Sequence, residues 1–335
     1  MILVTIDLFI SCLNISCKNE TETIQDVDPV KIQVHSDWFN EFGKISHHKE
    51  LFELIQKDSS LTGIIAKTIL NQSSKDSIIS TLFDFLNDSN RVQLRDSVSE
   101  RFGTYDWQNN LGEAFARYHA SFPDRDIPEV YTLITDFSFG IFNFRNDAGK
   151  DALGIGLEMF CGNTELFDQL SIQNPNFSSY ANRTFNSRHL AEKIMTSLAR
   201  DALTGPATNK VLDNLLYQGK ILYLVKKWLP RTEDTILFEY TAPQMAWVKS
   251  NELDMWRYLL SEKLLYKVSG KSVADLCEPA PHTQGMPPEA PGRAANYIGY
   301  KIISQYMKKM GVSDQALSLN TNYDRLLKES NYKPR

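Results

Sequence analysis

The stretch VYTLITDFSFGIFNF, residues 130–144, decides the fold class because it interrupts a chain whose apolar residues otherwise follow helical spacing. It is rich in β-branched and aromatic residues, which favour strands. The segment NDAGKDA at 146–152 then supplies turn residues, and ALGIGLEMF at 152–160 follows as a second apolar run. Together these segments predict a β-hairpin or part of a small sheet.

Helical spacing of apolar residues marks both sides of this stretch. Between residue 30 and about residue 102 it predicts three or four helices, and a further helix covers 111–119. After the strands we expect helices at 188–203, 209–228, 242–249, 251–266 and 292–310. The proline-rich segment 277–292 must be a loop. Few strands among many helices, without βαβ alternation, predict one α+β domain that is predominantly helical.

The overall charge and the cysteines narrow the class of protein. The 335 residues carry 36 basic and 41 acidic side chains, a net charge of −5, which gives no electrostatic reason to expect a nucleic-acid partner. Four cysteines without a C-x-x-C pair make a zinc-cysteine site unexpected. Cys161 and Cys277 either pair in an oxidising compartment or stay buried as free thiols, and the sequence leaves both readings open.

The N-terminal segment has the features of a lipoprotein leader. Residues 1–15 are mostly apolar but shorter than the roughly 20 residues that cross a bilayer as a helix. The polar run CKNETETIQDVDP at 17–29 follows as a flexible tether. In this reading 1–16 is a signal peptide, Cys17 becomes the acylated N-terminus, and 30–335 forms the globular domain. Cys12 is an alternative lipidation site, and an uncleaved anchor or a buried strand is the alternative for the whole segment.

The segment R-H-L-A-E-K-I-M at 188–195 is compared with the zinc-peptidase motif H-E-x-x-H, which lies on a helix after a sheet. Lys193 stands where the second histidine belongs, and Leu190 replaces the glutamate base. A lysine amine beside the site repels a metal ion, so we expect no metal, no catalytic residue and no cofactor here. A hydrogen-bonded structural histidine is the simpler reading of His189.

Arg293 is the most informative single polar residue. It follows Pro291-Gly292 at the start of the last long helix, where a cation opposes the helix dipole unless an acidic partner or a ligand compensates it. A structural salt bridge and a role in recognition are both open.

Several segments together, in order and rough spacing, resemble the gliding motility-associated lipoprotein GldB family: YTLITDFSFGIFNF, GIGLEMFCG, LLYQGKILYLVKKWLP, YTAPQMAWVKSNELDMWRYLLSEKLLY and PGRAANYIGYKIISQYMKK. The resemblance implies an envelope lipoprotein that supports the machinery of gliding. It also implies a distant relation to predicted zinc peptidases, and hence a single zincin-like domain with a small β-sheet. Segment 188–195 then lies where the peptidase motif would be, on a scaffold that has lost its metal.

We therefore expect a lipid-anchored envelope protein that is not an enzyme, in the outer rather than the inner membrane. It binds another envelope or gliding-machinery protein through a groove between the helices and the small sheet. The candidate polar cluster consists of His189, Glu192, Glu252 and Arg293. The alternative is a zincin-type metallopeptidase or hydrolase, with His189, Glu192 and Glu252 as a nonstandard cluster. A third reading is a helical envelope domain with a purely structural role.

Overall fold

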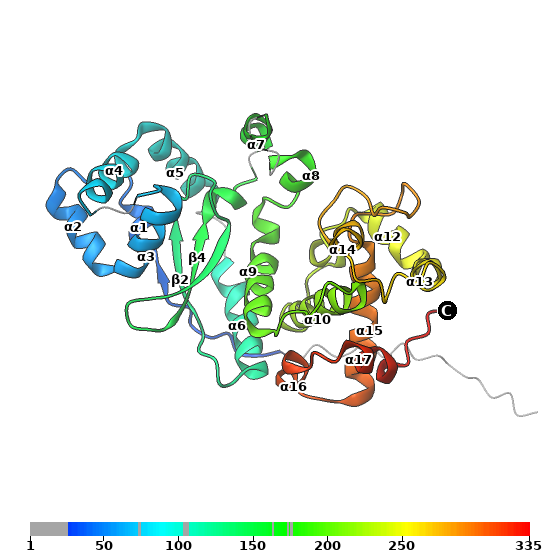
Figure 1. Cartoon of the computed structure of the whole chain (residues 1–335). Helices are drawn as coiled ribbons and strands as arrows, with labels where there is room; N and C mark the ends of the chain where they lie inside the picture. The colour runs from blue at the N-terminus through cyan, green and yellow to red at the C-terminus, as the bar shows by residue number, and fades with distance from the viewer. Residues whose placement is uncertain (1–25, 73–74, 103–106, 163, 173, 175–176) are drawn as a thin grey trace, which may run out of the picture.

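A computed structural model of the chain describes residues 26–72, 75–102, 107–162, 164–172, 174 and 177–335 (Figure 1). The expected signal peptide, the lipidation site Cys17 and the first part of the tether lie outside the described residues. No helix within the described ranges is long and apolar enough to cross a membrane.

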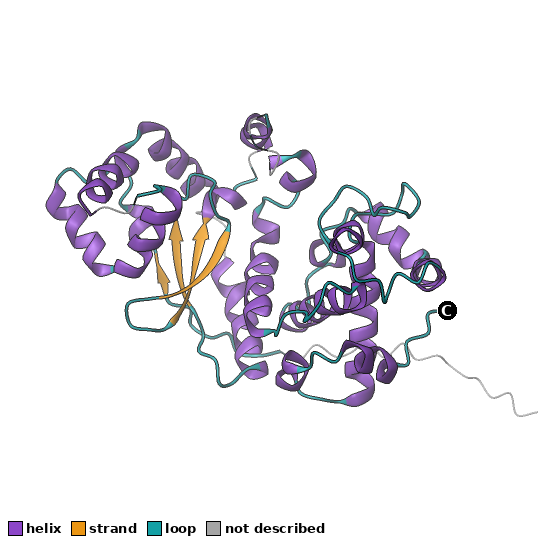
Figure 2. Ribbon diagram, in the orientation of Figure 1, coloured by secondary structure: helices purple, strands orange, loops and turns teal. Residues whose placement is uncertain are grey.

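The protein is α+β, with one small mixed sheet among many helices (Figure 2). Its strands are β1 (Val34–His35), β2 (Glu129–Leu133), β3 (Ile141–Arg145) and β4 (Asp151–Gly156), in the order β1-β2-β4-β3. The expected hairpin is confirmed, because β3 and β4 pair antiparallel. The strands β1, β2 and β4 run parallel, and neither β1 nor this parallel arrangement was expected.

The stretch 130–144 is not one strand, because the backbone turns sharply between β2 and β3. Asp136 and Phe137 both adopt positive φ angles, 53° and 59°. The turn is held by the buried side chain of Glu158, whose Oε1 accepts hydrogen bonds from the backbone N–H groups of Thr135 (2.8 Å) and Phe137 (3.1 Å) and from the Thr135 hydroxyl. Burial raises the pKa of Glu158 to about 7.

The N-terminal helices up to α5 form one end of the molecule beside the sheet (Figure 1), whereas α6 lies against α9 (Ser187–Ala202) and α10 (Val211–Trp228). They are α1 (Asp37–Asn40), α2 (His48–Lys57), α3 (Ser59–Ile64), the π-helical turn η1 (Ile65–Ile69), α4 (Lys75–Asn87), α5 (Ser89–Phe102) and α6 (Trp107–Ser121). The expected helix at 111–119 is α6, which is longer at both ends.

The C-terminal half is helical. Its elements are η2 (Leu157–Phe160), α7 (Thr164–Ser171), α8 (Ser179–Asn182), α9 (Ser187–Ala202), α10 (Val211–Trp228), α11 (Asp234–Leu237), α12 (Ala242–Ser250), α13 (Glu252–Ser261), α14 (Gly270–Cys277), α15 (Ala294–Met310), α16 (Asp314–Leu319) and α17 (Tyr323–Ser330). The expected helices correspond to α9, α10, α12, α13 and α15, although α13 ends five residues early, at Ser261 rather than Tyr266.

Helix α9 joins the two ends of the molecule. It stands between the sheet and the group formed by α10 and the helices after it (Figure 1), and it packs on β3, α6 and α10. One cluster of buried apolar side chains extends from Trp38 to Tyr332. Cys161 and Cys277 are both buried, and no disulfide joins the two.

Helices α10 and α15 cross at two glycines, where their backbones touch. A Cβ atom on Gly219 would lie 2.3 Å from the carbonyl carbon of Gly299, and one on Gly299 would lie 2.0 Å from the carbonyl oxygen of Leu215. Only glycine permits this approach, because any side chain would have to displace backbone atoms. The crossing therefore fixes where α15 begins relative to the rest of the fold.

We expect Gly219→Ala to lower the free energy of unfolding by about 3 kcal/mol, because overpacking against backbone cannot be relieved by a rotamer change. The matched control is Gly63→Ala on α3, where an added Cβ would meet nothing within 4 Å. That change should raise the free energy of unfolding by about 0.5 to 1 kcal/mol. Chemical denaturation of both variants measures the difference, and equal stabilities would contradict this view of the crossing.

Candidate functional site

A buried ion-paired cluster lies where α9, the turn after α11 and the start of α15 meet. The carboxylate of Glu239, in that turn, accepts hydrogen bonds from Lys193 Nζ and from Arg293 Nη2. Arg293 Nη2 also donates to the carbonyl oxygen of Phe238, at 3.1 Å. We call the following five residues the Glu239 cluster: His189, Glu192, Lys193, Glu239 and Arg293.

Both partners of the central ion pair adopt a left-handed backbone conformation. The φ angle is 52° at Glu239 and 55° at Arg293, the N-cap of α15. For a residue other than glycine this conformation costs about 1 kcal/mol or more, and it persists only where the surroundings enforce it. A salt bridge, one of the two roles left open for Arg293, is thus present and accompanied by backbone strain.

Contacts from α8 and α15 hold the turn that carries Glu239. Arg183 Nη2 donates to the carbonyl oxygen of Glu239 at 2.8 Å, and the guanidinium lies 3.6 Å from the centre of the Tyr180 ring. The hydroxyl of Tyr240 donates to the carbonyl oxygen of Gly292 at 3.1 Å. A third cation, Arg183, therefore lies beside Glu239.

Glu192 and His189 are buried on α9, and burial disfavours their charged forms. Burial raises the pKa of Glu192, whose Oε1 accepts from the Thr196 hydroxyl at 2.8 Å. Burial lowers the pKa of His189 to about 4, so this ring is neutral at pH 7 and donates through Nδ1 to Asn186 Oδ1 at 3.0 Å.

The cluster and the neighbouring Arg183 together carry a positive surplus. Burial raises the pKa of Glu239, but Arg293 and Lys193 outweigh it, so the pKa is lowered overall and the group is ionised. Three cations, Arg183, Lys193 and Arg293, thus surround one anion, while His189 is neutral and Glu192 tends toward its protonated form.

These residues do not fit a zinc ion. Zinc requires about three nitrogen, sulfur or carboxylate ligands, and no three His, Cys, Asp or Glu side chains gather suitably within the described residues. The Glu239 carboxylate, which could otherwise serve as a metal ligand, is paired with the Lys193 ammonium. The same ammonium places positive charge beside His189.

Three of the four expected cluster residues come together, and Glu252 makes its contacts elsewhere. Its carboxylate accepts from the hydroxyls of Tyr332 at 2.9 Å and Tyr297 at 3.3 Å, and lies 3.5 Å from Lys301 Nζ. Glu239, which is central to the observed cluster, was not identified from the sequence. The one signal for it was the need of Arg293 for an acidic partner, and that partner lies 54 residues away.

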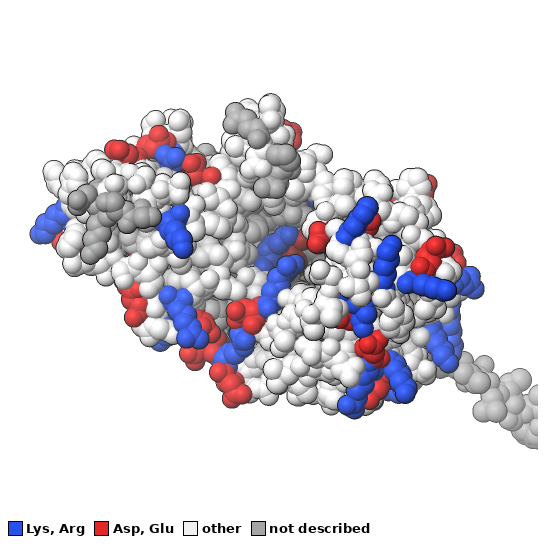
Figure 3. All heavy atoms as spheres, viewed as in Figure 1, with Lys and Arg blue, Asp and Glu red and all other residues white. Residues whose placement is uncertain are grey.

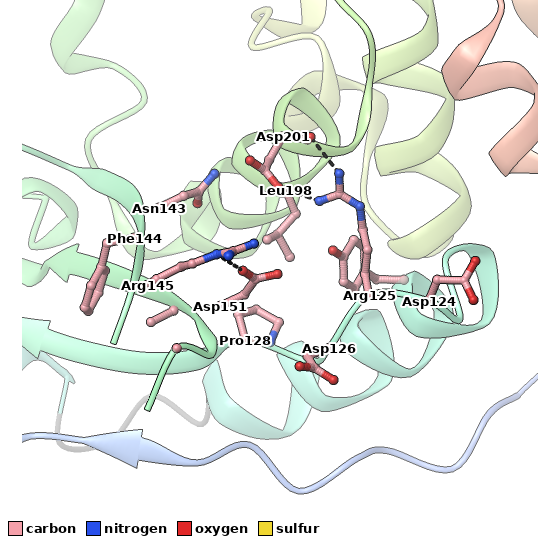
Figure 4. A pocket seen from close by; sticks show the side chains of 13 residues that line it. Asp124, Arg125, Asp126, Pro128, Asn143, Phe144, Arg145, Asp151, Leu198 and Asp201 are labelled. Atoms are coloured by element: carbon pink, nitrogen blue, oxygen red, sulfur yellow. Dashed lines mark hydrogen bonds and ion pairs between the residues drawn. The ribbon is translucent and has the colours of Figure 1, made fainter. Parts of the chain in front are cut away.

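A groove of about 630 Å³ lies between the sheet and the helices (Figure 4). It is lined by Tyr118, Asp124, Arg125, Asp126, Pro128, Asn143, Phe144, Arg145, Gly149, Asp151, Ala152, Leu198 and Asp201. Arg125 pairs with Asp201, and Arg145 lies 3.5 Å from Asp151. Four aspartates face two arginines, so the groove carries an acidic surplus. None of the four expected residues lines it.

The fold and the site define a helix-rich α+β protein with a strained, cationic polar cluster on one side of α9 and an acidic groove beside the sheet. The family model described as gliding motility protein GldB matches residues 17–334. The chain therefore belongs to the GldB family, a family of lipoproteins related to gliding motility. Comparisons with curated proteins and with solved structures gave no match.

We expect Glu239→Gln to lower the free energy of unfolding by about 3 kcal/mol, because it leaves the Lys193 and Arg293 cations partly buried without their anion. The matched control is Glu233→Gln, whose ion pair with Arg188 has both side chains 66 % exposed. The control should change stability by less than about 1 kcal/mol. Urea denaturation at pH 7 compares the two variants, and a Glu239→Gln protein as stable as the control would show that the pair does not hold the turn.

Proposed function

We propose that this protein is a lipid-anchored component of the cell envelope that supports gliding motility by binding another envelope protein, without catalysing a reaction. Membership of the GldB family carries the proposal. The matched region begins at Cys17, the residue that the leader pattern assigns as the acylated N-terminus. Two or more acyl chains there would hold the domain stably on a membrane.

The charges of the Glu239 cluster support a role without catalysis. In the zincin-like relation that the family resemblance implies, 188–195 would take the position of a peptidase motif, yet Lys193 from this segment is paired with Glu239. The nearby Arg293 is paired with the same carboxylate. A divalent metal ion at His189 and Glu192 would therefore face positive charge, which favours a scaffold that has exchanged metal binding for ion pairing.

The acidic groove between the sheet and the helices supports the binding role. Its volume of about 630 Å³ suits a few side chains of a partner segment. Because four aspartates face two arginines, charge complementarity favours a segment that carries Lys or Arg. We propose such a basic segment of another envelope protein as the occupant.

Fatty-acid labelling of the full-length protein tests the anchor. We expect the parent protein to take up labelled palmitate and to fractionate with the outer membrane, and Cys17→Ala to lose both properties. Cys12→Ala is the control, because Cys12 is the alternative site, and it should label like the parent. Labelling that survives in Cys17→Ala, or a parent found unlabelled in the soluble fraction, would remove the anchor from the proposal.

Site-specific photo-crosslinking in cells tests the groove. A photoreactive phenylalanine analogue at Arg145, an exposed lining residue, should give one discrete product that Asp126→Lys strongly reduces, because a new cation repels the basic segment. Asp168→Lys, an acidic residue outside the groove, should leave the product unchanged. The same analogue at Phe52, which is 51 % exposed on α2, should not give it. A product that also forms from Phe52, or that is insensitive to Asp126→Lys, would contradict the groove as the binding surface.

A further inference from the structure

Buried polar atoms without hydrogen-bond partners gather beside the Glu239 cluster. They are the Tyr180 hydroxyl, Arg183 Nε and Glu192 Oε2. Buried polar groups in native proteins are almost always hydrogen-bonded, so a group of orphaned atoms calls for an absent partner. Glu192 is only 3 % exposed, and its unpaired Oε2 belongs to the same carboxyl group that lies in the field of Lys193 and Arg293.

Lys193 and Arg293 have N–H donors that make no hydrogen bond with the described residues. Both hydrogen bonds that Arg293 makes with described residues use Nη2, so Nε and Nη1 remain. Lys193 makes one hydrogen bond and keeps two further N–H donors. The side chains of Lys193 and Arg293 are 28 % and 17 % exposed, so a ligand can reach them from solvent. Figure 3 shows the charged side chains on one face of the molecule, where Lys and Arg lie near the hollow between its two ends.

We propose that the Glu239 cluster is a second binding site, which holds a carboxylate group of a partner peptide between Lys193, Arg293 and Glu192. Lys193 and Arg293 already share one carboxylate, that of Glu239, so the two cations lie close enough together to act on a single carboxylate group. One added carboxylate reduces the surplus charge of three cations against one anion. Its two oxygens can each accept a hydrogen bond from the remaining donors, whereas a phosphate dianion would bring a second negative charge next to the Glu239 carboxylate.

The protonated form of Glu192 completes the site. With its proton on Oε2, Glu192 donates a hydrogen bond to the bound carboxylate, whereas the ionised form repels it. The charged groups that act on Glu192 are Lys193 on α9, Glu239 after α11 and Arg293 at the N-cap of α15. The groups that act on the neighbouring His189 and Arg293 are Tyr180 on α8, Arg183 directly after it, Arg188 on α9 and Tyr240 after α11.

Among those groups Glu192 controls the pH dependence near neutrality. Burial raises its pKa, whereas His189 stays neutral because burial lowers its pKa to about 4. The pKa of Glu239 is lowered, so it stays ionised, and burial raises the pKa of Tyr240, so it stays neutral. Carboxylate affinity should therefore fall as the pH rises from 6 to 8.5, because Glu192 loses its proton over this range.

Calorimetric titration of the full-length protein in detergent tests the site with four probes: N-acetyl-Ala-Ala with a free carboxyl terminus, its C-terminal amide, N-acetyl-aspartate amide and inorganic phosphate. We expect a carboxylate probe to bind at pH 6 and the dipeptide amide to bind at least about tenfold more weakly. Tighter binding of the free dipeptide assigns the site to a chain terminus, and tighter binding of the aspartate probe assigns it to an acidic side chain. Phosphate that binds more tightly than both would overturn the proposal.

Three variants separate a binding role from a structural one. Lys193→Met should weaken carboxylate binding at least about tenfold, whereas Lys227→Met, which removes a lysine paired with Asp314, should not change it. Glu192→Gln keeps a donor, so it should bind at pH 6 like the parent but lose the fall in affinity toward pH 8.5. This near-isosteric variant remains informative if Lys193→Met is too unstable to study. An unchanged affinity in Lys193→Met, or an unchanged pH profile in Glu192→Gln, would overturn the proposal.

The carboxylate site deepens the proposed binding role but is tested separately from the groove. Its probes are small molecules that do not depend on the envelope partner, and its variants lie outside the groove lining. Carboxylate binding without groove crosslinking would reject the groove and support this site. Groove crosslinking without carboxylate binding would support the groove and reject this site.

Discussion

The backbone contact between Gly219 and Gly299 determines where α15 lies, and the position of α15 determines where Arg293 lies. Helix α10 packs against both α15 and α9. The crossing therefore brings Arg293, the N-cap of α15, close to α9. Arg293 then meets Glu239 and Lys193 in a site that no single segment of the chain could form. The backbone at Arg293 and Glu239 keeps its positive φ angles because the helices packed on either side hold both residues in place.

The surroundings of α9 carry opposite charge at its two ends. Toward its start, the Glu239 cluster and the neighbouring Arg183 place three cations around one anion, and at its end Leu198 and Asp201 line the acidic groove. The groove's arginines are each near an aspartate, and none of its lining residues has an orphaned buried polar atom within the described chain. The Glu239 cluster has such atoms beside it. This difference is why a charge-complementary protein segment suits the groove, whereas a specific carboxylate suits the cluster.

Local sequence patterns predicted the secondary-structure elements well but did not predict how these elements contact one another. The apolar spacing of α9, α10 and α15 and the β-rich stretch 130–144 are local signals, and all gave the correct type of structure. The two-residue strand β1 has no such signal, because it exists only through its pairing with β2. In the site, the chemistry of Arg293 required an acidic partner, but Glu239 follows a helix of four residues and nothing in its neighbourhood marks it. Glu252 is also a glutamate, at the start of a helix, but its carboxylate contacts two tyrosines and Lys301 rather than Arg293.

A crystal structure of the full-length Cys17→Ala protein, grown at pH 6 with N-acetyl-aspartate amide and zinc, tests the central claim most directly. We expect a carboxylate within hydrogen-bond distance of Lys193 Nζ and Glu192 Oε2, with Glu239 still paired to Arg293. A zinc ion bound to His189 and Glu192, located by its anomalous scattering, would contradict a cationic binding site and restore the hydrolase reading. A probe bound only at other places on the surface would also contradict it.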